Sequence, residues 1–233
     1  MKGIGTEHES SLHRALKFRY AGEGGDTEIA RGGYVCDAVR PEGECIEVQT
    51  GSFKPLEDKV RHLSRSGPVR IVHPIILVKY IELFDPEGKI LSRRKSPRKG
   101  TVWDLFSALI YAPELPVLPG LTIELALVEV SERRVRDGRG SWRRRGVSIA
   151  DRELFSHHGT LSLAGVGAYR RFAPFEGGEP FTARALGMRA GILPALARKT
   201  LYVLTRLGIT ERIGKEGNAW VYSLTPERSA GHA

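Results

Sequence analysis

Cysteines and long apolar runs are scarce in this sequence, and each scarcity excludes a class of protein. Only two cysteines occur in 233 residues, whereas small secreted domains held together by disulfides contain many more. We therefore expect Cys36 and Cys45 to be reduced thiols, and they lack the further ligands that a zinc site needs. The longest apolar run, at residues 75–78 and their neighbours, is far too short to span a bilayer. The first residues, MKGIGTEHESS, contain no apolar signal segment, so we expect a cytoplasmic protein without a membrane partner.

Acidic residues are fewer than basic ones. The 27 Asp and Glu residues against 36 Lys and Arg residues give a formal net charge of +9. Such an excess indicates either a well-solvated basic surface or a polyanionic partner, for which nucleic acid is the usual choice. Clustering favours the partner, because basic residues concentrate at 89–99 and again at 133–145, where Arg143, Arg144 and Arg145 follow Trp142.

The segment 33–50 is predicted to form a β-hairpin. Residues 35–40 and 45–50 read as its two strands, and Pro41-Glu42-Gly43 supplies the turn, because proline fixes φ and glycine accepts a left-handed backbone. If Arg40 pairs with Glu44, the register of the whole hairpin follows from this turn.

This register predicts where the polar side chains of the hairpin lie. Asp37 is expected directly opposite Glu47, and strand alternation places Asp37, Glu47 and Gln49 on one face. The same alternation sends Cys36 and Cys45 to opposite faces. Two carboxylates beside an apolar core favour a bound cation, and a hard divalent ion such as Mg²⁺ prefers oxygen ligands.

A helix is predicted over residues 6–20, before the hairpin. Thr6 is a candidate N-cap, with Glu9 three residues later as in a capping box, and Leu12 and Leu16 belong to its apolar face. Glu9 therefore has two roles open to it, as a capping residue or as a third acidic group at the site, and the two are compatible.

Further elements follow the hairpin in an order typical of an α/β protein. We predict a helix at 55–65, a buried strand at 69–78 that lies parallel after this crossover, a hairpin at 79–92, a helix at 101–111, a strand at 121–130 and a mobile Arg/Gly-rich loop or hairpin at 133–145.

Asp37 followed ten residues later by Glu47-x-Gln49, with the acidic residue Glu9 on the preceding helix, resembles the PD-(D/E)XK nuclease superfamily. The resemblance implies a restriction-endonuclease-like domain at residues 1–150, with a mixed sheet flanked by helices. It implies that Asp37 and Glu47, together with Glu9, hold Mg²⁺ or Mn²⁺, and it favours a homodimer. Gln49 stands where this superfamily usually has a lysine that positions or activates the attacking water.

The last third of the chain predicts a helix, a turn at Gly191, a second helix opened by Pro194 and a two-stranded hairpin. This pattern resembles the winged helix-turn-helix fold of bacterial and archaeal DNA-binding proteins, here as a second domain at residues 151–233. The resemblance implies that the second helix enters the major groove and that the hairpin contacts the backbone. The residues it assigns to nucleic acid are Arg198, Lys199, Tyr202, Arg206 and Lys215.

These features predict a metal-dependent nuclease that hydrolyses phosphodiester bonds in DNA, with Glu9, Asp37, Glu47 and Gln49 as its catalytic residues. Two alternatives stay open. Gln49 in place of lysine is compatible with a catalytically inactive nuclease fold used for DNA binding or regulation. Winged helices also contact proteins, so the chain could instead be an accessory subunit of a DNA repair or defence complex.

Overall fold

The computed structural model of the chain describes residues 9–140 and 142–226. The chain divides into two compact units, and each is built from three segments. Unit 1 comprises Met1–Thr50, Val69–Val102 and Glu124–Ser162, and unit 2 comprises Gly51–Pro68, Trp103–Ile123 and Leu163–Ala233. The units therefore interleave along the sequence, where we expected a single boundary at residue 150. Within the described residues, every helix is too short or too polar to cross a membrane.

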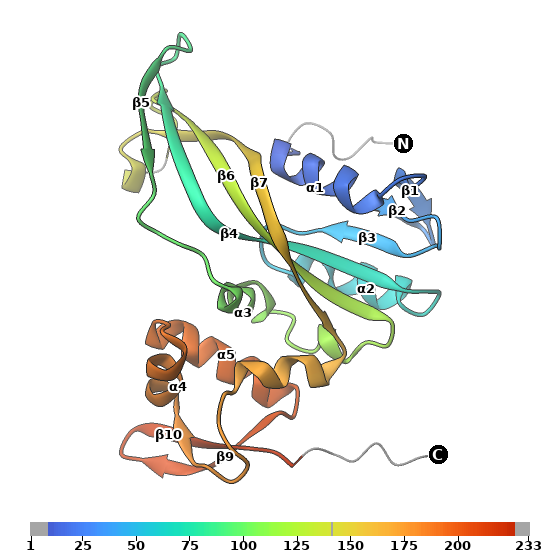
Figure 1. Cartoon of the computed structure of the whole chain (residues 1–233), viewed down its shortest axis with the longest axis vertical. Coiled ribbons are helices and arrows are strands. Elements are labelled where there is room, and N and C mark those ends of the chain that lie inside the picture. Colours follow the sequence, from blue (N-terminus) through green and yellow to red (C-terminus); the bar gives the residue numbers. More distant parts are fainter. Residues whose placement is uncertain (1–8, 141, 227–233) are drawn as a thin grey trace. The chain divides into compact units, whose positions relative to one another are not determined.

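Unit 1 is built around a mixed sheet with the strand order β1-β2-β3-β4-β6-β7, and β5 pairs beside β4 (Figure 1). β1, β2 and β3 form an antiparallel meander, and β3 lies parallel to β4. The predicted α/β class, with a mixed sheet flanked by helices, is confirmed. The strands are β1 Asp26–Arg31, β2 Tyr34–Val39, β3 Cys45–Val48, β4 Val69–Phe84, β5 Ile90–Lys95, β6 Leu121–Val135 and β7 Ser148–Ala164.

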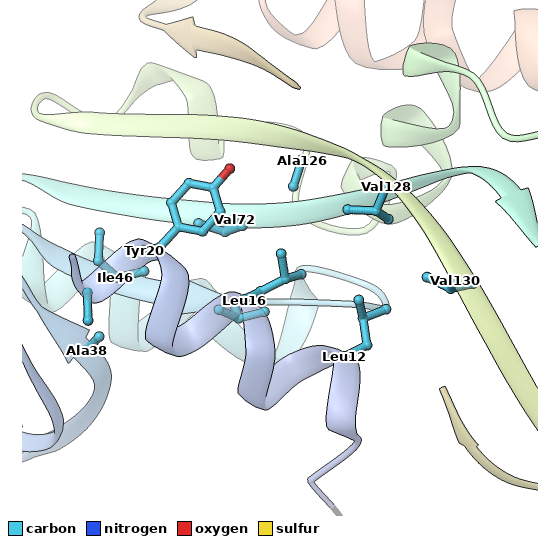
Figure 2. Packing of buried hydrophobic residues seen from close by; sticks show 11 residues of the cluster. Leu12, Leu16, Tyr20, Ala38, Ile46, Val72, Ala126, Val128 and Val130 are labelled. Atoms are coloured by element: carbon cyan, nitrogen blue, oxygen red, sulfur yellow. The ribbon is translucent and has the colours of Figure 1, made fainter. Parts of the chain in front are cut away.

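Helix α1, Ser11–Ala21, covers one face of this sheet. It begins after Ser10, whose side chain accepts a hydrogen bond from the His13 N–H, so Ser10 and not Thr6 is the N-cap. Thr6 lies outside the described residues. Leu12 and Leu16 are buried on the inner face of the helix. They pack in one cluster with Ala38, Ile46, Val48, Val72, Ala126, Val128 and Val130 (Figure 2).

Two strands are longer than their apolar patterns predicted, and a third was not predicted. β4 and β6 continue past the expected ends at residues 78 and 130, and β7 was not predicted at all. Besides the apolar contacts, ion pairs of the Glu132 side chain connect these three strands. Glu132 is fully buried and pairs with Lys79 on β4 (3.2 Å), Arg134 on β6 (2.5 Å) and Arg152 on β7 (2.8 Å). Burial acts to raise the Glu132 pKa, but hydrogen bonds from Arg152 and Arg134 and the charge of Lys79 lower it to about 2.

Unit 2 contains the predicted helix, turn, second helix and hairpin, together with a short additional strand. Gly191 ends the first helix in a left-handed conformation with φ of 64°, which explains glycine at this turn. The three strands have the order β8-β10-β9. The elements are η1 Lys54–Leu56, α2 Glu57–Leu63, α3 Leu105–Leu109, η3 Leu115–Val117, η5 Val166–Phe172, β8 Phe181–Thr182, α4 Ala183–Ala190, α5 Pro194–Arg206, β9 Thr210–Glu216 and β10 Ala219–Leu224. The 3-10 turn η2, Val102–Asp104, begins at the last residue of a unit 1 segment and continues into unit 2, and η4, Trp142–Arg144, lies in unit 1.

Candidate functional site

The β2–β3 hairpin has the register that its turn predicted. The Arg40 N–H donates to the Glu44 carbonyl at 3.0 Å, and Val39 pairs with Cys45. The paired strands end at the next step, where Ala38 lies opposite Ile46. Beyond it the Asp37 carboxylate accepts a hydrogen bond from the Val48 N–H at 2.7 Å. A side-chain oxygen of Asp37 thus takes the place of a backbone acceptor for the Val48 N–H. The β2–β3 pairing stops before Asp37, so the expected pair of Asp37 with Glu47 does not form.

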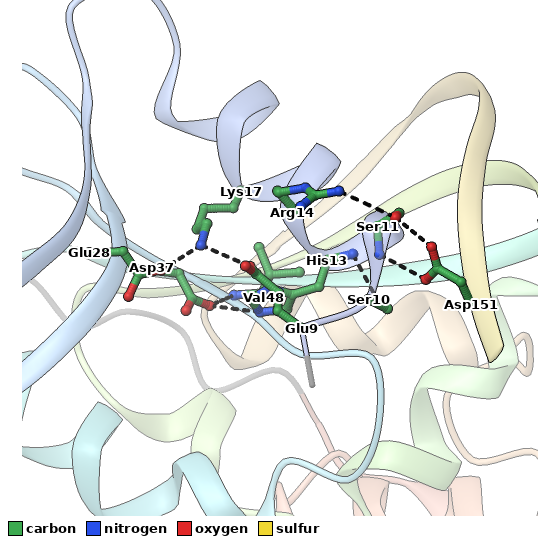
Figure 3. Close-up of polar contacts among 10 residues, drawn as sticks. All are labelled: Glu9, Ser10, Ser11, His13, Arg14, Lys17, Glu28, Asp37, Val48 and Asp151. Atoms are coloured by element: carbon green, nitrogen blue, oxygen red, sulfur yellow. Dashed lines mark hydrogen bonds and ion pairs between the residues drawn. The ribbon is translucent and has the colours of Figure 1, made fainter. Parts of the chain in front are cut away.

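Asp37 contacts helix α1 through His13. The His13 Nε2 atom lies 3.2 Å from a carboxylate oxygen of Asp37, and the Nδ1 atom lies 2.5 Å from Glu9 Oε1 (Figure 3). Burial acts to lower the His13 pKa, but the hydrogen bonds and charges of Asp37 and Glu9 outweigh it and raise this pKa to about 9. At neutral pH His13 is therefore a cation that bridges two carboxylates.

Lys17 adds a second cation to this cluster. Its ammonium group lies 2.8 Å from Glu9 Oε1 and also pairs with Glu28 on β1 (Figure 3). Burial acts to raise the Glu9 pKa, but the Lys17 and His13 hydrogen bonds lower it. Glu9 is thus an ionised group of the site, and the N-cap role belongs to Ser10.

The structure does not gather the predicted Mg²⁺ ligands around one point. Glu9 and Asp37 lie on either side of His13, and protein cations already neutralise them. Glu47 lies elsewhere: its carboxylate is buried within 4.8 Å of the sulfur atoms of Cys36 and Cys45. The Gln49 carbonyl lies 2.6 Å from His73 Nδ1, and the Gln49 N–H donates to the Val72 carbonyl. In the described part of the chain, Glu9, Asp37 and Glu47 do not bring their carboxylate oxygens within 4.8 Å of one another, so as arranged they do not form a shared Mg²⁺ site.

The prediction that the two cysteines are reduced thiols on opposite faces is wrong for this structure. Cys36 and Cys45 form a disulfide with their Cα atoms 6.3 Å apart. Strand alternation predicts opposite faces only while two strands stay paired, and the pairing of β2 with β3 stops before Cys36. The prediction assumed that β2 and β3 stay paired as far as Cys36 opposite Val48, whereas their pairing ends at Ala38 opposite Ile46.

Helix α5 carries four of the residues predicted to bind nucleic acid. Arg198 and Tyr202 are exposed and stand four residues apart, so they share one face of the helix. Lys199 donates to the Ser107 hydroxyl at 3.1 Å, while Arg206 pairs with Glu114. The latter two contacts lie within unit 2 and hold part of α5 against the α3–η3 segment.

The β9–β10 hairpin carries Lys215, and next to it a basic residue that was not among the predicted ones. Arg212 and Lys215 both lie over the Trp220 ring, at 4.7 and 4.5 Å from its centroid. Every residue from Glu211 to Trp220 is exposed. A tryptophan five and eight residues after two basic residues in a hairpin is the signal that would have identified this pair.

The two Arg-rich segments lie in unit 1. β5 is exposed over its whole length, and Arg93 on it lies 5.0 Å from the centroid of Tyr80. The segment expected to be a mobile loop includes the 3-10 turn Trp142–Arg144, where Arg143 stacks over Trp142. Arg144 donates to the Val147 carbonyl at 3.1 Å, and Arg145 is exposed.

The bridging His13 predicts a pH dependence of stability. A pKa raised from 6.5 to about 9 on folding stabilises the protein fully below pH 6.5, and this stabilisation is lost as the pH rises through 9. We expect the free energy of unfolding to fall by about 3 kcal/mol over this window, at about 1.4 kcal/mol for each unit of pKa. Urea unfolding of the wild type and of His13→Gln from pH 6 to 9.5 measures it. The variant should lose most of the decrease, and an equal decrease in both proteins would contradict this role.

The fold and these contacts define an α/β protein in which a mixed sheet and helix α1 carry a cluster of acidic and basic side chains, and which also contains a helix pair followed by a basic hairpin. The chain belongs to the family described as Domain of unknown function (DUF8091), whose model matches residues 10–164. The match begins at the N-cap of α1 and ends at the last residue of β7. The helix pair and the hairpin of unit 2 lie outside it.

A similar protein occurs in Treponema pallidum (strain Nichols) and is described there as an uncharacterized protein. It is 30% identical over 151 residues, which is 65% of this chain and 60% of that protein. The chain therefore matches less than two thirds of the length of this relative. No solved structure matches the chain.

Proposed function

We propose that the protein binds nucleic acid, and DNA in particular, through α5 and the β9–β10 hairpin. The observation that carries this proposal is the exposed set on these two elements: Arg198 and Tyr202 on the helix, and Arg212 and Lys215 on the hairpin. α5 packs against β9 within unit 2, so the four side chains belong to one compact body.

The chemistry of these side chains suits a polyanion. Arginine and lysine neutralise phosphates, and arginine offers a planar fork that matches phosphate oxygens. The net charge of +9 acts in the same direction by raising the rate of encounter with nucleic acid. The order β8-α4-α5-β9-β10 supports the resemblance to winged helix-turn-helix proteins, which place the second helix in the major groove.

The contacts within unit 2 divide the predicted nucleic-acid residues into two groups. Lys199 and Arg206 are engaged with Ser107 and Glu114, so binding through them requires those contacts to be exchanged. Among residues 9–140 and 142–226, no acidic side chain pairs with Arg198, Arg212 or Lys215, so these three need no such exchange there. We assign the main phosphate contacts to Arg198, Arg212 and Lys215, with Tyr202 beside them.

A second candidate function is metal-dependent phosphodiester hydrolysis. It is supported by the order α1-β1-β2-β3-α2-β4 with β3 parallel to β4, which agrees with the resemblance to PD-(D/E)XK nucleases. Glu9 and Asp37 also approach one another, through His13, where the β2–β3 ladder ends. Against it, His13 and Lys17 neutralise these acids and Glu47 lies apart. The geometry therefore favours binding over cleavage.

One experiment separates these candidates. Full-length protein is incubated with duplex, single-stranded and branched DNA and with RNA, in Mg²⁺, Mn²⁺ or EDTA, and both retardation and cleavage are read on gels. We expect duplex DNA to be retarded equally with and without metal and to stay intact. Metal-dependent cleavage that Asp37→Asn abolishes would instead establish the nuclease. Absence of retardation at micromolar protein would overturn nucleic-acid binding and favour a protein partner.

A further inference from the structure

Cys36, Cys45 and Glu47 form a compact group of buried metal-type donors in unit 1. One ligand atom of each, the two sulfurs and a carboxylate oxygen, lies within 4.8 Å of the other two. The three residues are 0%, 1% and 2% exposed. In the described part of the chain no other group of three or more histidine, cysteine or acidic side chains is this close.

The disulfide prevents these sulfurs from binding a metal, because each sulfur is bonded to the other. Reduction by a dithiol breaks the S–S bond: two electrons and two protons pass to the sulfurs, and the reductant is itself oxidised to a disulfide. The two protons are then released when the thiols bind a cation as thiolates.

The spacing suits such a cation. Two sulfurs that bind one tetrahedral Zn²⁺ ion, each at about 2.3 Å, are roughly 3.8 Å from each other. After reduction the two sulfurs therefore need to move only a short distance apart to form both metal–sulfur bonds. The Cα atoms, 6.3 Å apart, need little movement. Thiolates select borderline and soft metals over Mg²⁺. Two thiolates balance the charge of Zn²⁺, and the carboxylate is a further ligand type that zinc accepts, which leaves the site with one net negative charge.

We propose that reduction of the Cys36–Cys45 disulfide creates a buried Zn²⁺ site formed by Cys36, Cys45 and Glu47. The disulfide and the metal are then alternative cross-links between β2 and β3, at the point where backbone pairing stops. Its three ligands are not members of the Glu9–His13–Asp37 cluster, and the proposal does not depend on nucleic-acid binding.

The test is zinc binding by the full chain in its two redox states. Oxidised protein, and protein reduced with dithiothreitol and desalted under nitrogen, are each equilibrated with Zn²⁺ and gel-filtered, and bound metal is counted by mass spectrometry. We expect one zinc per reduced chain and none per oxidised chain. Co²⁺ in place of Zn²⁺ should give a thiolate charge-transfer band in the reduced protein.

Variants identify the ligands. Cys45→Ser should lose the charge-transfer band, and Glu47→Gln should bind zinc more weakly. Glu28→Gln is the matched control, because it removes an exposed carboxylate that pairs with Lys17 and leaves the three proposed ligands in place, and it should bind zinc like the wild type. Thermal unfolding under reducing conditions establishes that each variant is folded. Equal zinc in the oxidised chain, no zinc in the reduced chain, or wild-type zinc binding by Cys45→Ser would overturn the proposal.

Discussion

Replacing Arg198, Arg212 and Lys215 together by alanine will lower the affinity for duplex DNA by about 100-fold at physiological salt. Each neutralised phosphate releases condensed counterions, so each basic side chain that is removed from the interface weakens binding by roughly fivefold at this salt. The three side chains are exposed, so their removal leaves the core of unit 2 unchanged. Fluorescence anisotropy with a labelled duplex measures the effect.

The matched control is Arg19→Ala. It removes an exposed positive charge of the same kind from α1, in unit 1, without altering α5 or the hairpin. We expect its affinity to stay close to that of the wild type. Two results would contradict this assignment: wild-type affinity in the triple variant, or a loss in Arg19→Ala as large as the loss per charge in the triple variant. Either result would mean that the net positive charge of the whole chain, and not this surface, determines DNA affinity.

Leu201→Ala will lower the free energy of unfolding of the unit that contains α5 by about 2–5 kcal/mol. Leu201 is fully buried on the inner face of α5, together with Ala197 and Leu204. Truncation to alanine removes its apolar contacts and leaves a cavity that a packed core fills only in part. Urea unfolding, followed by tryptophan fluorescence, measures the loss.

Arg198→Ala provides the comparison within the same helix. It lies three residues from Leu201 but is exposed, so we expect a change in unfolding free energy within about 0.5 kcal/mol. The two substitutions should therefore separate stability from DNA binding on a single helix. A small effect of Leu201→Ala would show that this face of α5 is not part of a well-packed core.

Local signals in the sequence predicted much of the fold. The Pro-Glu-Gly turn predicted the register of the β2–β3 hairpin, and the pair of Gly191 and Pro194 predicted where α4 ends and α5 begins. These features depend on backbone conformation within a few residues, and no distant segment alters them.

Features that depend on distant residues were missed. β7 was not predicted because its side chains are largely polar and half-exposed, and Glu132 ties it to β4 and β6 through ion pairs that no periodicity reveals. The candidate acids were identified, but their grouping was not. Glu9 was placed on the predicted helix, yet nothing local indicated that His13 would join it to Asp37, nor that Glu47 lies with the cysteines.

The measurement that tests nucleic-acid binding by this surface most directly is the salt dependence of duplex affinity, for the wild type and for the Arg198, Arg212 and Lys215 triple alanine variant. The logarithm of the association constant should fall linearly with the logarithm of salt concentration. The slope of the variant should be smaller by about 2.7, or roughly 0.9 for each of the three phosphates that it no longer neutralises. Equal slopes in the two proteins would contradict the assignment and place the phosphate contacts elsewhere on the chain.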